Sequence, residues 1–357
     1  MERLKKWWIL MGEEGVGPVR LRNQVEAMGS LDRTWRHVQM SRSSFSSLVK
    51  RRLEAMDLTL ADSNTWALSW EDLDYPSRWR ELSDAPVVIF GQGSRKAHHD
   101  WPFLGIVGTR NCSQRAAELS FEIAQFAAIQ GWGVVSGLAK GVDAMAHRGA
   151  CYGEGITMAC LGGPLHRIYP REHRGLADEI LGRGGTLITE RAYNDEVHPW
   201  HFASRNRLIV GMSQALVLVQ SPARGGALIS AQLALESGVD CWVYRPDSSR
   251  MNDKRWAGNL KLLEEFPSMG WSSVEELFVQ LRRPLRPSIT PSVEIGMEPE
   301  LLPIWKCIIQ KGGAQMSEIA QYCGSDAASV MRKLFILELN GMVQRIPGGW
   351  YIPRHLG

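Results

Sequence analysis

Apolar and polar positions alternate along the middle of the chain in the manner of a parallel sheet with crossover helices. Between about residues 66 and 266, short apolar runs are separated by gaps long enough for a helix. The predicted strands are 103–107, 133–136, 156–161, 186–189, 215–219 and 241–244. After the first strand, Ala116, Leu119, Ile123, Phe126 and Ala127 recur at spacings of three and four, which places one helix face on the sheet. This pattern predicts an α/β fold with an extended Rossmann-like parallel sheet and helices on both faces.

The segments on either side of the predicted sheet have different patterns. The first 65 residues are helical in pattern, with the turn Gly15-Val16-Gly17-Pro18 between helices, and we expect a small domain of helix-hairpin-helix or SAM-like type. From Leu301 onward, three helices and two short strands are predicted, which is the order of elements in a winged helix. A proline- and arginine-containing stretch precedes them and is predicted to be a linker. The expected parts are a helical domain 1–65, a Rossmann-like domain 66–267, a linker 268–297 and a winged-helix domain 298–357.

Composition and charge narrow the classes of protein that fit. The 357 residues are 44% hydrophobic, which is enough for two or three folded domains. The net charge of +3 is too small to indicate a nucleic-acid partner by itself, so any basic surface must be local. The six cysteines form no C-x-x-C pair and histidines do not cluster, so we expect a cytoplasmic protein without disulfides, metal or cofactor. No apolar run approaches a membrane span, and no membrane partner is expected.

The turn after the first predicted strand carries candidate phosphate ligands. Loops at the carboxyl ends of parallel strands present free backbone N–H groups to ligands. Here Gly108-Thr109-Arg110 follows the strand, and Ser113 lies where it can cap the next helix. The turn lacks the G-x-G-x-x-G fingerprint of dinucleotide sites, and its arginine and hydroxyls suit an isolated phosphate better than a pyrophosphate.

The loop after the second predicted strand is richer in such groups. Its candidate phosphate-binding residues are Ser136, Gly137, Lys140 and Gly141. The glycines permit close approach of the backbone to a ligand, while the hydroxyl and the ammonium group suit phosphate oxygens. Asp143 and His147 follow one helical turn apart. We interpret them as a capping pair that holds the loop, in preference to a general acid–base pair.

Three further segments complete the candidate site. Gly162 and Gly163 follow the third strand, and Arg224-Gly225-Gly226 follows the fifth. Arg205, Asn206 and Arg207 precede the fifth strand on one helical turn. They are included as candidate phosphate contacts, and the alternative is that Arg205 and Arg207 are solvated or salt-bridged structural residues, because successive side chains diverge around a helix. In that alternative, one of them braces the glycine loops.

Taken in order, these segments resemble the DprA (Smf, DNA-processing protein A) family. The matching residues are Tyr75-Pro76, Gly108-Thr109-Arg110, 136–143 with Ala146-His147, Leu161-Gly162-Gly163 with Tyr169-Pro170, Thr189-Glu190, 205–211 and Gly258-Asn259. The resemblance covers roughly residues 66–266 and implies a non-catalytic protein that binds single-stranded DNA, protects it and loads the RecA recombinase during natural transformation. It also implies a homodimer. Carried over residue by residue, Arg110 and Lys140 grip phosphates, assisted by Thr109, Ser136 and Gly137.

The sequence departs from the family pattern in two places. The family has a Ser-Gly-Ser/Thr turn after the fifth strand, whereas this chain has Arg224-Gly225-Gly226-Ala227, which leaves the contacts of that loop open. The Val-Pro-Gly after the last strand is replaced by Tyr244-Arg245-Pro246-Asp247.

Two enzymatic alternatives fit the sequence less well than DNA binding. Related Rossmann-like phosphoribohydrolases have a catalytic glutamate after a Gly-Gly loop, but the nearest carboxylate after Gly225-Gly226 is Glu236, about two helical turns on. A nicotinamide-dependent oxidoreductase lacks its fingerprint here. In the predicted winged helix, the helix 326–339 carries only Arg332 and Lys333 as cations, so protein contact is slightly favoured over duplex DNA.

Overall fold

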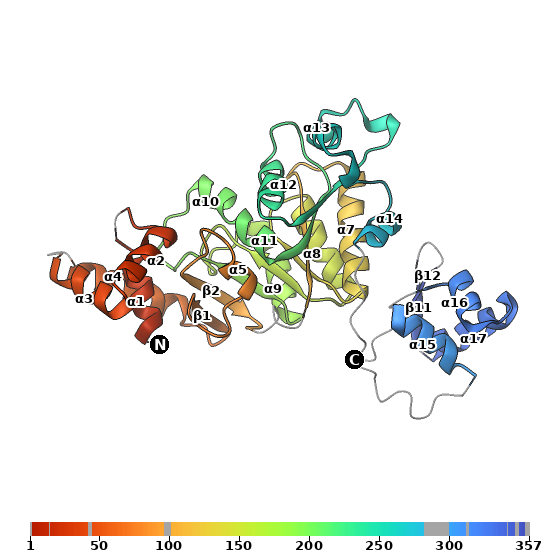
Figure 1. Cartoon of the computed structure of the whole chain (residues 1–357), viewed down its shortest axis with the longest axis horizontal. Coiled ribbons are helices and arrows are strands. Elements are labelled where there is room, and N and C mark those ends of the chain that lie inside the picture. The colour runs from red at the N-terminus through yellow and green to blue at the C-terminus, as the bar shows by residue number, and fades with distance from the viewer. Residues whose placement is uncertain are drawn as a thin grey trace. The chain divides into compact units, whose positions relative to one another are not determined.

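The computed structural model describes residues 2–13, 15–41, 45–95, 101–281, 300–311, 314–340, 342–346 and 350–353 (Figure 1). The chain divides into two compact units. The larger unit contains residues 1–128 and 132–277, and the smaller contains residues 129–131 and 278–357. The candidate site residues all belong to the larger unit.

A nine-stranded sheet forms the centre of the larger unit. Its order is β1-β2-β6-β5-β4-β3-β7-β8-β9, in which β1 and β2 are antiparallel to their neighbours and all other pairs are parallel. The strands are β1 Thr65–Ser69, β2 Val88–Gly93, β3 Phe103–Val107, β4 Gly133–Ser136, β5 Thr157–Cys160, β6 Thr186–Thr189, β7 Ser213–Leu218, β8 Asp240–Tyr244 and β9 Gly270–Trp271. The predicted α/β class and the six predicted strands are confirmed.

Strands β3 to β6 are predictable because every residue in them is buried, as expected for parallel strands with both faces covered. The other three strands were missed. The first residues of β1 are only half-buried and show no alternation, and β9 is two residues long. Strand β9 and helix α14 (Val274–Gln280) lie inside the range predicted as a linker, so that prediction starts too early. Residues 282–297 of the predicted linker lie outside the described residues.

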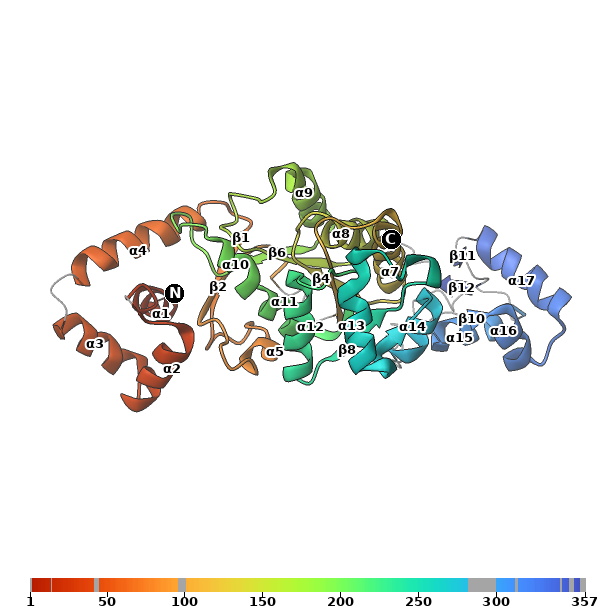
Figure 2. The same cartoon turned by 90° about the horizontal axis from the view of Figure 1, so that it is seen from above.

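Helices cover both faces of the sheet, and the chain reverses direction beside β3. From β3 the chain moves outward through β4, β5 and β6, and then returns to β7 on the other side of β3. Figure 2 shows α7, α8 and α9 on one side of the sheet and α11, α12 and α13 on the other. The helices are α5 Ser77–Arg80, α7 Gln114–Ile129, α8 Val142–Tyr152, α9 Arg174–Gly182, α10 Pro199–Ser204, α11 Asn206–Met212, α12 Gly226–Glu236 and α13 Ala257–Glu265. Four 3₁₀ turns accompany them, η1 Arg171–His173, η2 Ser248–Arg250, η3 Lys254–Trp256 and η4 Pro267–Met269.

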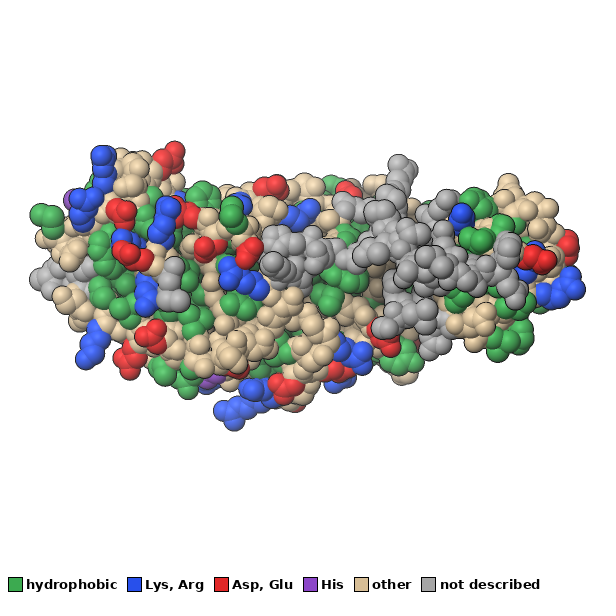
Figure 3. Space-filling model, turned by 90° about the horizontal axis from the view of Figure 1, so that it is seen from below, with side chains coloured by type: hydrophobic (Ala, Val, Ile, Leu, Met, Phe, Trp, Pro, Cys, Tyr) green, Lys and Arg blue, Asp and Glu red, His purple; other side chains and the backbone are tan. Residues whose placement is uncertain are grey.

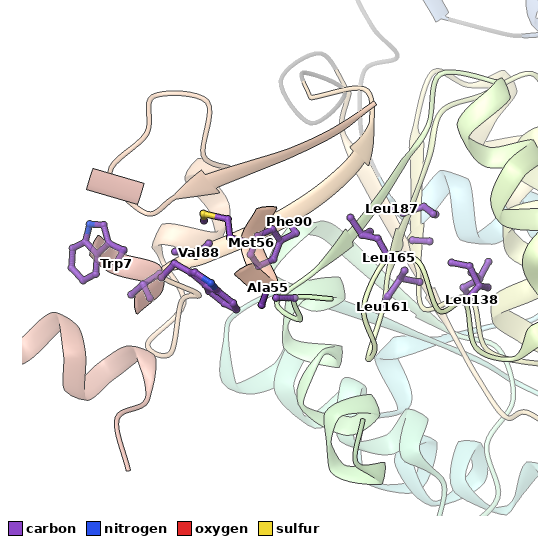
Figure 4. Packing of buried hydrophobic residues seen from close by; sticks show 14 of the residues in the cluster. Trp7, Ala55, Met56, Val88, Phe90, Leu138, Leu161, Leu165 and Leu187 are labelled. Atoms are coloured by element: carbon purple, nitrogen blue, oxygen red, sulfur yellow. The ribbon is translucent and has the colours of Figure 1, made fainter. Parts of the chain in front are cut away.

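The N-terminal helices share a hydrophobic core with the edge of the sheet. They are α1 Glu2–Leu10, α2 Pro18–Ala27, α3 Leu31–Ser41 and α4 Phe45–Thr59. The indole of Trp8 meets the ring of Phe90 edge to face, with centroids 4.9 Å apart. Figure 4 shows Ala55 and Met56 of α4 beside Phe90, and the same cluster continues through Leu187 to Leu138 at the end of β4. The residues predicted as a separate N-terminal domain therefore belong to the same compact unit as the sheet.

The smaller unit has its own core. Its elements are α15 Leu302–Lys311, β10 Ala314–Gln315, α16 Met316–Cys323, α17 Ala327–Leu339, β11 Val343–Ile346 and β12 Trp350–Pro353. The three predicted helices and the two predicted strands are present, and β10 adds a third strand in the order β10-β12-β11. On α17, Val330, Leu334 and Leu337 are buried while Met331, Phe335 and Leu339 are exposed. Among the described residues, none of the helices has the length and apolar character needed to span a bilayer.

Candidate anion-binding site

A hollow of about 760 Å³ opens at the carboxyl ends of β3 to β6. It is lined by Arg110, Lys140, Gly163, Arg167, Ile168, Tyr169, Pro170, Arg171, Glu172, Val197, Pro199 and Phe202, and we call it the basic hollow. Four of these side chains are cations and one is a carboxylate. The backbone loops around it come from four strands, which is where open α/β sheets bind ligands.

Arg110 and Lys140, predicted from separate segments, both line the basic hollow. The guanidinium carbon of Arg110 lies 5.7 Å from the ring centroid of Phe202, at cation–π distance. The ammonium group of Lys140 forms an ion pair with the Glu172 carboxylate on the rim. That hydrogen-bonded partner raises the pKa of Lys140, so the side chain is a cation at neutral pH.

A glycine at the start of α8 brings these two cations together. Gly141 has φ +76°, and a side chain there would collide with the backbone carbonyls of Thr109 and Arg110. The next backbone N–H, from Val142, donates to the carbonyl of Thr109 over 3.3 Å. Lys140 is therefore held next to the turn that carries Arg110.

Ser136, Gly137 and Arg205 form the framework beside the basic hollow, and Gly137 and Arg205 also line a smaller pocket with Arg110 and Lys140. The Ser136 hydroxyl is buried and donates to the carbonyl of Ile106 over 2.6 Å. Arg205 is 5% exposed, and its guanidinium donates to the carbonyls of Gly137 and Cys160. A side chain at Gly137 would overlap that guanidinium. The Ser136 hydroxyl is thus taken up by a protein partner, and the contacts of Arg205 support the bracing alternative, while its phosphate contact stays a prediction.

Asp143 supports this framework as predicted, but His147 does so from another position. Asp143 accepts from the backbone N–H of Ala139 over 3.4 Å and lies 3.6 Å from the Arg205 guanidinium. Burial raises the pKa of Asp143, and Arg205 opposes that rise. His147 instead contacts Thr157, with 2.7 Å between Nδ1 and Oγ1, so it does not pair with Asp143. Burial lowers the pKa of His147 to about 3.

Arg207 and Asn206 are also occupied by protein partners. Arg207 makes a bidentate pair with Glu190, at 2.7 and 2.8 Å, and a third contact with Asp84 at 2.7 Å. Burial lowers the pKa of Arg207, but the Glu190 carboxylate outweighs burial and raises it overall. The Asn206 amide oxygen accepts from Arg205 Nε over 3.0 Å. The prediction that Arg207 contacts phosphate is therefore corrected, and the salt-bridged alternative describes it.

Ser113 caps the helix that follows the first turn. Its hydroxyl accepts from the backbone N–H of Ala116 over 3.2 Å and from the Gln220 amide over 3.1 Å. The backbone N–H of Thr109 donates to the Gln220 carbonyl over 2.8 Å. Gln220, which follows β7, thus joins the loops at the point where the strand order reverses. Ser113 is a capping residue and does not line the basic hollow.

The glycines after β5 and β7 have different positions. Gly163 lines the basic hollow, and Gly162 is packed against Phe202 so closely that a side chain would collide with the ring. The segment Arg224-Gly225-Gly226 lies after β7 and does not line the basic hollow. Arg224 is exposed there, at the start of α12.

Several residues of the basic hollow were not predicted. Arg167 and Arg171 flank Tyr169-Pro170 in the loop after β5, and Phe202 lies on α10. The rings of Tyr169 and Phe202 are 5.2 Å apart. The sequence signal for these residues is the high density of cationic and aromatic side chains directly after Gly162-Gly163. That stretch has no periodicity that would show which way its side chains point.

The positive charge of the site is local. On the face in Figure 3, the described Lys and Arg side chains lie among Asp and Glu side chains and do not gather in one patch. No group of three or more His, Cys, Asp or Glu side chains within the described ranges is arranged to hold a metal ion. The basic hollow itself offers cations and aromatic faces as its ligand-binding chemistry.

Comparison with known proteins gives consistent matches. Residues 66–282 match the family described as DNA recombination-mediator protein A. DNA processing protein DprA of Bacillus subtilis is 33% identical over 207 residues, which are 58% of this chain and 68% of that protein. The structure of DprA from Streptococcus pneumoniae matches with a TM-score of 0.60 and 24% identity, over 78% of this chain and 96% of that one. A structure of DNA processing protein A from Helicobacter pylori, concerned with that protein's single-stranded DNA binding mode, matches with a TM-score of 0.53 and 24% identity, over 60% and 95% of the two chains.

Proposed function

The chain belongs to the DNA recombination-mediator protein A family, and on that premise we propose that it binds single-stranded DNA in the basic hollow without catalysing a reaction on it. The observation that carries the proposal is the convergence of Arg110, Lys140, Arg167 and Arg171 on one hollow whose walls include two aromatic rings. Cations for the backbone and aromatic faces for bases are the two features that single-strand binding requires.

The positions of the cations fit a polynucleotide backbone better than a small charged metabolite. They come from three different loops, after β3, β4 and β5, so the basic hollow offers several separate positive charges. Several separate positive charges match the repeating negative charge of a polynucleotide backbone. The hydrogen bonds of Ser136 and Arg205 to backbone carbonyls hold the loops of the basic hollow in place.

The hydrolytic alternative lacks an acid in the right place. Glu236 is the last residue of α12, whereas Gly225 precedes its first turn. The two ends of this helix are about 15 Å apart at 1.5 Å per residue. Glu236 instead accepts a hydrogen bond from Gln232 over 2.9 Å. This arrangement favours a binding role over nucleotide cleavage.

Two further roles are proposed from family membership alone. The protein is expected to form a homodimer, which sedimentation equilibrium measures directly. It is also expected to pass bound single strands to the RecA recombinase, which is tested by the rate of RecA filament formation on strands pre-covered with a single-strand-binding protein. A monomer at all concentrations, or an unchanged filament rate, contradicts the respective role.

The test of DNA binding compares a labelled 20-nucleotide single strand with the matching duplex across a salt series. We expect preferential single-strand binding that weakens with salt, with a log–log slope of about 0.7 per phosphate contacted. Arg110→Ala and Arg171→Ala should each weaken binding and reduce the slope. Arg183→Ala removes an exposed arginine at the end of α9, outside the basic hollow, and is the matched control. Salt-independent binding, or equal losses in all three variants, contradicts the proposal.

A further inference from the structure

Trp200 differs from the other tryptophans of this chain. Among the tryptophans whose side chains the structure describes, only Trp200 is exposed, with 59% of its surface accessible. The others are buried or partly buried, as expected for a side chain that contributes mainly to packing. An indole left in water next to a candidate binding site indicates a role outside the core.

Helix α10 links Trp200 directly to the basic hollow. Pro199 and Phe202 of this helix line the hollow, and Trp200 is two positions before Phe202. Two positions correspond to about 200° around a helix, so the two rings leave α10 on opposite sides. With its side chains a helix is about 10–12 Å across, so a strand that crosses α10 from the hollow reaches Trp200 within a few nucleotides.

The surroundings of Trp200 suit a nucleotide. The guanidinium carbon of Arg191 lies 5.8 Å from its ring centroid and provides a cation for a phosphate. The exposed ring of His198 is within 6° of parallel to the indole, with centroids 6.3 Å apart, so a base stacked on one ring lies parallel to the other. The ring of His201 meets the indole edge to face, with the two ring centroids 3.8 Å apart, and holds it in place.

The segment that carries this group is anchored at several points. The backbone N–H of His198 donates to His201 Nδ1 over 3.1 Å at the start of α10. The backbone N–H of Tyr193 donates to the Thr59 hydroxyl of α4 over 2.8 Å. A ring held in this way loses little freedom when a ligand stacks on it.

We propose that Trp200, Arg191 and His198 form a stacking shelf for an unpaired base of a DNA strand whose backbone occupies the basic hollow. The inference rests on the proposed function and adds a base-binding subsite to it. The shelf takes any base, because stacking uses the π face and reads no hydrogen-bonding edge. A duplex is excluded from the shelf, since its bases are stacked on one another and present only their edges.

The test measures binding of two single-stranded oligonucleotides of equal length, one of thymidines and one with abasic sites throughout. We expect Trp200→Ala to weaken thymidine binding by roughly fivefold or more and to leave abasic binding unchanged. Trp200→Phe should restore most of the affinity. Tyr152→Ala is the matched control, because Tyr152 is 68% exposed at the far end of α8 and does not line the hollow.

The outcomes separate the shelf from the function on which it rests. If Arg110→Ala weakens both oligonucleotides but Trp200→Ala weakens neither, the shelf is wrong and the basic hollow remains. If Trp200→Ala weakens both oligonucleotides equally, Trp200 acts on the backbone or the fold, and base stacking is overturned. Absence of wild-type binding to both oligonucleotides overturns the proposed function together with the shelf.

Discussion

Replacing Arg205 with methionine tests whether a buried cation holds the floor of the basic hollow. Arg205→Met keeps most of the side chain's length but removes the guanidinium. The Asp143 carboxylate then loses its partner at 3.6 Å, and the carbonyls of Gly137 and Cys160 lose their donors. Removing one member of a buried ion pair costs about 3–5 kcal/mol, and each unsatisfied carbonyl about 1–3 kcal/mol.

These contributions do not add in full. Burial already raises the pKa of Asp143, so without Arg205 this carboxyl takes up a proton and relieves part of the cost. We therefore expect Arg205→Met to lower the free energy of unfolding by about 3–5 kcal/mol. Urea unfolding followed by circular dichroism at pH 7 measures this value. Arg174→Met removes an exposed arginine that pairs with Asp178, and it should cost less than about 1 kcal/mol.

A double-mutant cycle identifies the source of the loss. In an Asp143→Asn background the buried charge is absent, so Arg205→Met should cost at least about 1 kcal/mol less than in the wild type. The reasoning is refuted if Arg205→Met costs no more than the Arg174→Met control, or if its cost is the same in both backgrounds.

Three further changes have defined outcomes. Glu172→Gln removes the carboxylate that pairs with Lys140, so affinity for a single-stranded oligonucleotide should rise about twofold or more, and an unchanged or lower affinity contradicts this. The pKa of His147 is about 3 when folded, below its ordinary value of 6.5, so the unfolded state binds more protons between these pH values. Stability should fall as pH drops from about 6.5 towards 3, by up to about 1.4 kcal/mol per pH unit, and His147→Gln should remove that part of the slope in urea unfolding at several pH values. Gly141→Ala places a side chain at φ +76° against the carbonyl of Thr109, so it should lower the free energy of unfolding by about 1–3 kcal/mol, whereas a neutral result shows that the turn tolerates a side chain.

The central strands could be predicted because burial on both faces leaves a continuous apolar run. Phe103–Val107 has five buried residues in a row, and its ends were predicted to the residue. Gly270–Trp271 is too short to give any pattern and pairs in parallel with β8 only in the folded chain. Its place in the sheet depends on tertiary contacts that a short stretch of sequence does not contain.

The candidate site was predictable where the position of a residue after a strand is enough to place it at the basic hollow. Arg110 and Lys140 directly follow strands and line the basic hollow. Ser136 is the last residue of β4, and its hydroxyl donates to the carbonyl of Ile106, 30 residues away in sequence. Arg207 pairs with Glu190, 17 residues away. Position after a strand identifies the edge of the sheet, whereas the direction of each polar side chain is decided by partners that the spacing does not reveal.

The ion pair between Lys140 and Glu172 means that the basic hollow carries a tethered anion of its own. Under the proposed function, an incoming phosphate exchanges with this carboxylate at Lys140, and the effective concentration of the carboxylate is on the order of millimolar or higher because both groups belong to one chain. A single inorganic anion at lower concentration loses that competition. A polymer delivers many phosphates to the same place, so under the proposed function the pair favours polyanions over the small anions of the surrounding solution.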